Sequence, residues 1–219
     1  MPIALAVKAA LSAARMSTYE SCAIAAGHDA ASALTLYAWN ARISGALLIP
    51  LHICEVVVRN AVADALEFTH GPDWPWNQGF ERSLPRQAGP GYNALADLQY
   101  VRQKSRTPGQ VIAELKFVFW EKMFTSRHDN RIWNQHLNRV LPNLSAARTT
   151  AEHRKRIFDD LNKIRLLRNR IAHHEPIFAR NLFEDLQIIR QLVAARCTVS
   201  ADWLLTHQQV SETLKRRPF

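Results

Sequence analysis

The hydrophobic positions of this chain recur every three to four residues, as on one side of a helix, and not every second residue, as in a strand. The longest such segment covers 31–69, where Leu51, Cys54 and Val58 fall on one side of a helical wheel. Pro50 inside this segment predicts a kink or the beginning of a second helix. No five-residue run alternates strongly in the manner of a strand. The pattern therefore predicts an all-α protein.

Shorter helices are predicted along the rest of the chain. They are expected at 1–17 (amphipathic), 111–124, 131–140, 150–174, 181–196 and 200–215. The helix at 150–174 should stop before Pro176, because the residue that precedes a proline is disfavoured in a helix. Ser200 is the predicted N-cap of the last helix. The aromatic helix at 111–124 is interpreted as core packing, without a role in chemistry.

The segment 71–109 differs in composition from its surroundings. It holds five of the seven glycines and five of the ten prolines, which predicts a long loop with room for a short helix at 92–104. Trp74 and Trp76 are expected to pin this loop to the body of the protein. We therefore predict one domain over 1–219, with a core at about 31–196, the loop insertion at about 71–109 and a C-terminal helix at about 200–216.

Composition and charge narrow the class of protein. Hydrophobic residues make up 47% and charged residues 21% of the 219 positions, which excludes a disordered or collagen-like chain. The formal net charge of +9 fits an anionic partner such as nucleic acid, but fits a solvated basic surface equally well. Between 148 and 196 eleven Lys and Arg stand against six Asp and Glu.

The cysteines and the apolar runs bear on location. Cys22, Cys54 and Cys197 lie far apart and form no CxxC pair, which favours a reducing, cytoplasmic compartment. The apolar run 43–58 is interrupted by Pro50 and by polar residues, so we expect no membrane-spanning helix. The N-terminus lacks a basic segment before its apolar stretch, so we expect no secretory signal.

The stretch RLLRNRIAHHEPIF at 165–178 carries the candidate chemistry. On the predicted helix Arg168 falls inside the apolar arc, where a guanidinium must be paired or line a cleft. Asn169 and His173 lie one turn apart on its flank. A histidine can exchange a proton with a ribose 2′-OH, and an arginine can neutralise the phosphate oxygens. The set therefore suits cleavage of RNA without a metal or other cofactor.

Spacing alone does not single this stretch out, because an Arg followed five positions later by His occurs three times in the chain. The context of the third pair, Arg168 and His173, distinguishes it from the other two. That context includes the Asn after Arg168, the double His and the end of a helix. The run LRNRIAHHEPIF resembles the signature of the Abi-like (abortive-infection) proteins of the HEPN superfamily. YAWNARISGALLIPLHICEVVVRNAVADAL, GQVIAELKFVFWEKMF, ADWL and the terminal RRP extend the resemblance from about residue 36 onward.

The resemblance implies a HEPN-like helical bundle that forms a homodimer, in which Arg168, Asn169 and His173 of both protomers line one cleft and cleave RNA. Glu55, Arg59 and Asn60 match a recurrent LE-x-x-LRN-like element of the family, with Cys54 where Leu is usual. From the helical wheel alone, Glu55 and Arg59 are expected either to form an internal ion pair or to orient Arg168. Asn60 is expected to be exposed or at a dimer contact.

His174 points away from Asn169 on the predicted helix and is a candidate for contact with the partner protomer. The resemblance thus implies a metal-independent endoribonuclease that acts in bacterial phage defence or as a toxin, with an antitoxin or other regulator as a further partner. The alternative is a non-catalytic HEPN module that binds RNA or a protein. A metal hydrolase that uses the double His is a weaker third interpretation, because adjacent helical residues diverge and only Glu175 lies near as a further ligand.

Overall fold

The structure is a computed structural model that describes residues 3–86 and 89–219. Every regular element in this part of the chain is helical, which confirms the all-α prediction. The α-helices are α1 (Ile3–Leu11), α2 (Ala13–Ala25), α3 (Ser32–His70), α4 (Gln78–Ser83), α5 (Ala94–Lys104), α6 (Pro108–Glu114), α7 (Phe117–Met123), α8 (Asn134–Val140), α9 (Thr150–Ala172), α10 (Leu182–Arg196), α11 (Thr198–His207) and α12 (Val210–Lys215). Two 3-10 turns, η1 (Trp74–Trp76) and η2 (Ser126–His128), and a π-turn, η3 (Asp129–Trp133), complete the set.

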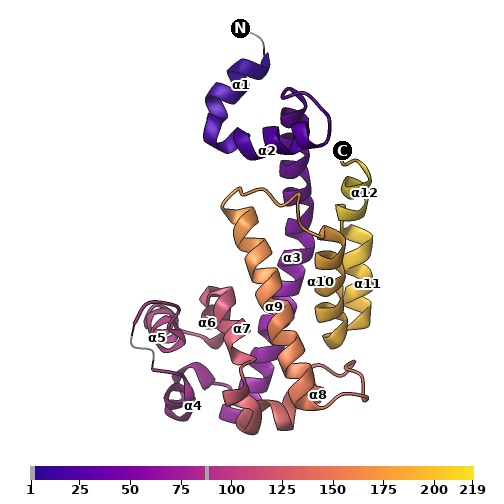
Figure 1. Ribbon diagram of the computed structural model, residues 1–219. Helices are drawn as coiled ribbons and strands as arrows, with labels where there is room; N and C mark the ends of the chain where they lie inside the picture. Colours follow the sequence, from indigo (N-terminus) through magenta and orange to yellow (C-terminus); the bar gives the residue numbers. More distant parts are fainter. Residues whose placement is uncertain (1–2, 87–88) are drawn as a thin grey trace.

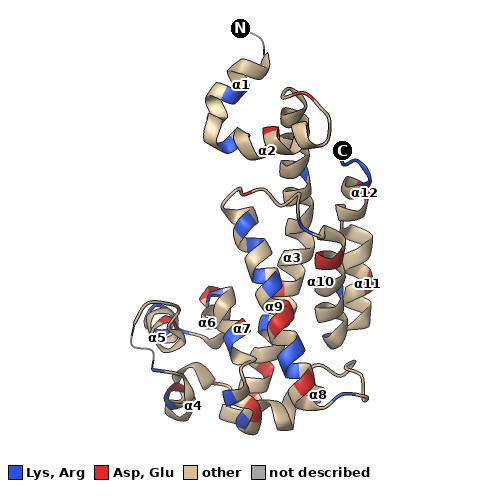
Figure 2. Ribbon diagram, viewed as in Figure 1, with Lys and Arg blue, Asp and Glu red and all other residues tan. Residues whose placement is uncertain are grey.

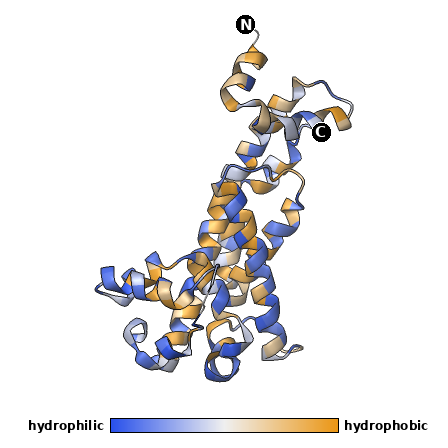
Figure 3. Ribbon diagram, turned by 60° about the vertical axis from the view of Figure 1, so that its left-hand side comes forward, coloured by the Kyte–Doolittle hydropathy of each residue, from blue (hydrophilic) through white to orange (hydrophobic). Residues whose placement is uncertain are grey.

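Helix α3 runs through the length of the bundle and carries its core (Figure 1). Leu36, Ile43, Leu47 and Cys54 are fully buried along one side of it. Helices α2 and α12 pack on its first half, α10 on its middle, and α7 and α8 on its last turns. Pro50 lies inside this helix and is buried, so the expectation that a second helix begins there is wrong. Figure 3 shows the hydrophobic residues gathered along this axis.

By length and composition α3 is the one helix in the described chain that could cross a membrane, and a third of its most apolar window is buried inside the bundle. The core helix of a soluble protein meets the same criterion. In the structure α3 packs against α2, α8, α10 and α12.

Several predicted helices are divided in the structure. The segment expected to be one helix at 111–124 forms α6 and α7, because Leu115 and Lys116 between them are extended. Leu115 is buried at this break, so its packing is retained while the helix direction changes. The helix expected at 200–215 likewise divides into α11 and α12 at Gln208, and Cys197 rather than Ser200 is the N-cap of α11. The N-terminal segment forms two helices, of which α1 buries no residue.

Residues 87 and 88 lie outside the described chain. The described part of the segment 71–109 is not mostly loop, which corrects the prediction. It contains η1, α4 and α5, and the last of these confirms the helix expected at 92–104. Asn77 connects α3 to α4, because its side chain donates to the carbonyl of His70 (3.1 Å) and accepts from the N–H of Phe80 (3.0 Å). Trp74 is buried as expected, whereas Trp76 is 37% exposed. The glycines and prolines therefore separate short helices whose apolar side chains join the core.

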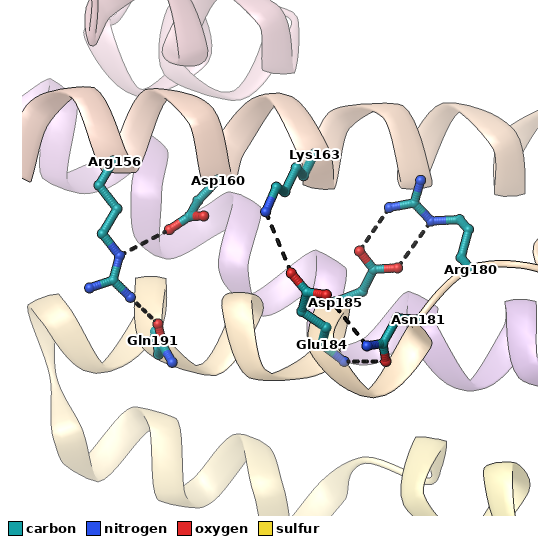
Figure 4. Close-up of polar contacts among 8 residues, drawn as sticks. All are labelled: Arg156, Asp160, Lys163, Arg180, Asn181, Glu184, Asp185 and Gln191. Carbon is teal, nitrogen blue, oxygen red and sulfur yellow. Dashed lines mark hydrogen bonds and ion pairs between the residues drawn. The ribbon is translucent and has the colours of Figure 1, made fainter.

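Helices α9 and α10 lie side by side and are joined by polar contacts at their rim (Figure 4). Lys163 on α9 pairs with Glu184 on α10 (3.5 Å), and Arg156 donates to Gln191. Helix α10 begins after Asn181, whose side chain accepts from the N–H of Glu184 (3.1 Å). Ion pairs of this exposed kind add little stability. The association of the two helices therefore depends mainly on apolar packing.

A histidine-rich cluster lies at the end of the bundle where α3 meets η2 and α8. His128 is 2% exposed, and burial together with the charges of Arg127 and Arg131 lowers its pKa from 6.5 to about 4. Burial and the charge of Arg131 also lower the pKa of His70. The folded protein therefore keeps His128 neutral under conditions in which the unfolded chain would bind a proton there.

We predict that the free energy of unfolding falls as the pH drops from 6.5 towards 4. In this window the unfolded chain takes up a proton at His128 and the folded protein does not, a difference worth roughly 3 kcal/mol by proton linkage. Urea unfolding at a series of pH values should show this loss in the wild type and much less of it in His128→Gln. The exposed His207→Gln is the matched control. A wild-type pH profile in His128→Gln would contradict the assignment.

Candidate active site

Arg168 lies on the surface of α9 and not in the apolar core, which corrects the prediction from the helical wheel. The buried side of α9 is formed by Ile157, Leu161, Ile164 and Leu167, and Arg168 stands at its edge. Figure 1 shows α6 and α7 beside the first half of α9. Arg168 lies in its second half and is exposed. The requirement for an internal partner therefore disappears, and no other described residue pairs with the guanidinium.

Asn169 and His173 are joined through the backbone at the end of α9. The N–H of His173 donates to the carbonyl of Asn169 (2.9 Å), so the two residues lie one turn apart as predicted. The side chain of His173 is exposed, and that of Asn169 is half-buried. Neither side chain forms a hydrogen bond with another described residue. Arg168, Asn169 and His173 thus lie within the last two turns of one helix, with their polar groups available to a ligand.

His174 ends the helix in a left-handed conformation, with φ of 55°. Two hydrogen bonds close the turn, from the N–H of Glu175 to the carbonyl of Arg170 (2.8 Å) and from the N–H of His174 to that of Ile171 (3.0 Å). This pair of bonds defines a Schellman motif, whose left-handed position is usually a glycine. The two adjacent histidines therefore have different backbone conformations, which no helical wheel could show.

Three further contacts fix this turn. Arg15 of α2 donates to the carbonyl of His174 (2.5 Å), and Arg170 donates to the carbonyl of Pro176 (2.8 Å). The buried side chain of Asn40 on α3 accepts from the N–H of Ile177 (2.8 Å). The end of α9 is thereby tied to α2 and to α3, so His173 is presented from a rigid support and not from a free loop.

The residues singled out on α3 do not join this group by direct contact. Glu55 and Arg59 are half-buried and form no ion pair with each other, so the predicted internal pair is wrong. No contact links either of them to Arg168 within the described residues. The Nε of Arg59 is buried without a partner. Asn60 is exposed, as expected.

Sequence reasoning missed an ion pair that holds α9 against α7. Glu121 is fully buried, and its carboxylate accepts from Arg165 and lies 3.1 Å from Lys122. Arg165 also donates to the side chain of Asn162 (2.7 Å), which removes Asn162 from the polar surface near Asn169. The only sequence signal was the charged pair Glu121 and Lys122 within an aromatic, mostly apolar helix. A buried carboxylate of this kind needs a cation from a neighbouring element.

The electrostatic surroundings of the site are basic. Figure 2 shows Lys and Arg distributed along α9, and Arg170 pairs with Glu175 (3.5 Å) at its end. Arg15 lies on the other side of the turn. In the described chain no three His, Cys, Asp or Glu side chains are grouped so that they could hold one metal ion.

Comparisons with models of protein families, with curated proteins and with solved structures give no match for this chain.

The left-handed conformation of His174 leads to a test of the turn. Replacing it by glycine removes the steric cost that an L-residue pays there, about 1 kcal/mol, so His174→Gly should raise the free energy of unfolding by about that amount. The matched control is His173→Gly, because His173 has φ of −93° and gains nothing from glycine. Urea unfolding at pH 7 measures both. Destabilisation by His174→Gly would show that its side chain, and not its conformation, supports the turn.

Proposed function

We propose that this protein is a metal-independent endoribonuclease of the Abi-like HEPN type, active as a homodimer in phage defence or as a toxin under the control of an antitoxin or other regulator. The observation that carries the proposal is the placement of Arg168, Asn169 and His173. Their side chains stand unpaired in the last two turns of α9, whose end is tied to α2 and α3. Such an arrangement is rigid and open to a polymeric substrate.

The chemistry follows from the properties of these three groups. The His173 imidazole takes the proton of a ribose 2′-OH, and the 2′ oxygen attacks the adjacent phosphorus. The guanidinium of Arg168 neutralises the charge that develops on the non-bridging oxygens, and the Asn169 amide donates to the same phosphate. The bond from phosphorus to the 5′ oxygen breaks, which leaves a 2′,3′-cyclic phosphate or its 3′-phosphate hydrolysis product and a 5′-OH end.

Dimerisation would supply the second histidine that a single site lacks. One imidazole cannot accept the proton of the nucleophile and donate a proton to the leaving 5′ oxygen at the same moment. Two motifs that face one cleft provide two histidines, one as base and one as acid. The resemblance to HEPN dimers and the exposed position of His173 both support this arrangement.

We predict that the wild type cleaves a mixed RNA pool in the presence of EDTA and leaves cyclic or 3′-phosphate ends. His173→Ala should lose at least about 100-fold in rate, which is the usual contribution of a general acid or base. Arg168→Lys should lose part of the rate, because the charge remains but the planar fork does not. Sequencing of the product ends and gel analysis give both readouts.

The matched control is His207→Ala, which removes another exposed histidine at the end of a helix, α11. It should cleave at the wild-type rate. Equal cleavage by His173→Ala and the wild type would refute the catalytic assignment. If no variant cleaves but all bind RNA or a protein partner equally well, the non-catalytic module is the better account.

A further inference from the structure

A cavity of about 410 Å³ opens beside the proposed catalytic turn. Its walls come from three elements, with Tyr19 on α2, Tyr37 and Leu48 on α3, and Ala172 and His174 at the end of α9. Ala172 lies one turn beyond Arg168 on the same side of α9, and His174 directly follows His173. The cavity therefore lies beside the turn that carries His173, although Arg168, Asn169 and His173 are not among its lining residues. Its volume is in the range of small-molecule pockets.

The hydroxyl of Tyr19 is the first sign that this cavity binds a polar ligand. Tyr19 has no exposed surface, yet its Oη has no hydrogen-bond partner in the described chain. Leaving a buried hydroxyl unsatisfied is unfavourable, and such groups are rare in folded proteins. Burial, and then the proximity of Tyr37, raise the pKa of Tyr19 to about 12, so the hydroxyl keeps its proton at neutral pH. It is a donor without an acceptor in the described chain, and because none of its surface is exposed, a ligand in the cavity reaches it only when neighbouring side chains move.

Asn40 offers a second donor on the same wall. Its Oδ1 accepts from the N–H of Ile177 (2.8 Å), which fixes the orientation of the amide. The amide nitrogen then has two hydrogens that no other described residue receives. Asn40 is 5% exposed and lines the cavity with Tyr19. Two buried donors thus stand among lining residues that include Tyr37 and Leu48, with Ser44 and His174 as further polar groups.

Gly45 stands at the exposed edge of the cavity. It lies in the interior of α3, where glycine is unfavourable relative to alanine. Packing does not require it, because a Cβ at this position would meet no atom within 4 Å. It lines the cavity together with Tyr37, whose ring centroid lies 5.1 Å from that of Tyr19. A side chain at 45 would occupy space beside the two tyrosines.

We propose that this cavity is the subsite that holds one nucleobase of the RNA next to the cleaved phosphate. The base lies against Tyr37 and Leu48, and its oxygen acceptors receive hydrogen bonds from the Tyr19 hydroxyl and the Asn40 amide. Donors on the protein favour oxo bases, uracil and guanine, over bases that present an amino group in the same place. The inference rests on the proposed ribonuclease function and adds its base preference.

The direct test is binding of the four nucleoside 3′-monophosphates to the full chain by isothermal titration calorimetry. We expect the uridine or guanosine nucleotide to bind most tightly, Gly45→Leu to weaken that binding at least tenfold, and Tyr19→Phe to reduce the preference while the ring is retained. Thr35→Leu adds the same side chain at an exposed position of α3 outside the cavity and should bind as the wild type does. Arg168→Ala should weaken all four nucleotides alike. Wild-type binding by Gly45→Leu, or no binding by the wild type, would overturn the subsite.

Cleavage assays separate the subsite from the proposed function. If RNA is cleaved and Gly45→Leu cuts with unchanged rate and base preference, the subsite is wrong and the ribonuclease stands. If no RNA is cleaved but nucleotide binding depends on Gly45 and Tyr19, the subsite stands and the ribonuclease is wrong. Light scattering is the last readout, since a changed oligomeric mass of Gly45→Leu with unaltered nucleotide binding would assign the cavity to a protein contact.

Discussion

The architecture depends on the need to cover one very long apolar helix. Helix α3 has 39 residues and therefore extends for about 58 Å. No single neighbour is long enough to cover it, so separate parts of the chain cover separate sections: α2 and α12 near its beginning, α10 at its middle, α7 and α8 near its end. On the side where α9 approaches it these covers leave a gap, which contains the cavity and borders the candidate catalytic turn. The candidate catalytic turn at the end of α9 therefore lies beside the section of α3 that lines this cavity.

The turn after α9 holds the end of this helix in a fixed position beside the cavity. A helix that ended freely at Ala172 would carry its last side chains on a fraying end. Here the Schellman bonds, Arg15 and Asn40 fix the backbone from three directions, although only Asn40 among these groups is buried. Rigidity comes from backbone contacts, which leaves the side chains of Arg168 and His173 uncommitted. A preorganised site also needs its side-chain rotamers held by neighbouring groups, and within the described chain no hydrogen bond or ion pair holds those of Arg168 and His173.

Hydrophobic periodicity predicted the helical class, the long helix α3, and α9 and α10 to within a few residues, because these helices bury one continuous side. It failed where a buried residue stands at a break: Leu115 continues the apolar pattern across the extended link between α6 and α7. It also placed Arg168 in the core, since a helical wheel describes one helix and contains nothing about how far α7 reaches along it. The order of Arg168, Asn169 and His173 was readable from sequence. The supports of the turn were not, because Arg15 and Asn40 lie more than 130 residues away.

The long sequence separation between α3 and α10 also determines the order in which the protein can fold during synthesis. Helix α3 is complete at His70, whereas α10, which covers its middle, begins at Leu182. At ordinary rates of translation the chain needs on the order of ten seconds to make the residues between them. Throughout that interval an apolar surface that is later core stays open to solvent and to other chains. Productive folding of this protein in the cell therefore depends on what shields α3 before its C-terminal half arrives.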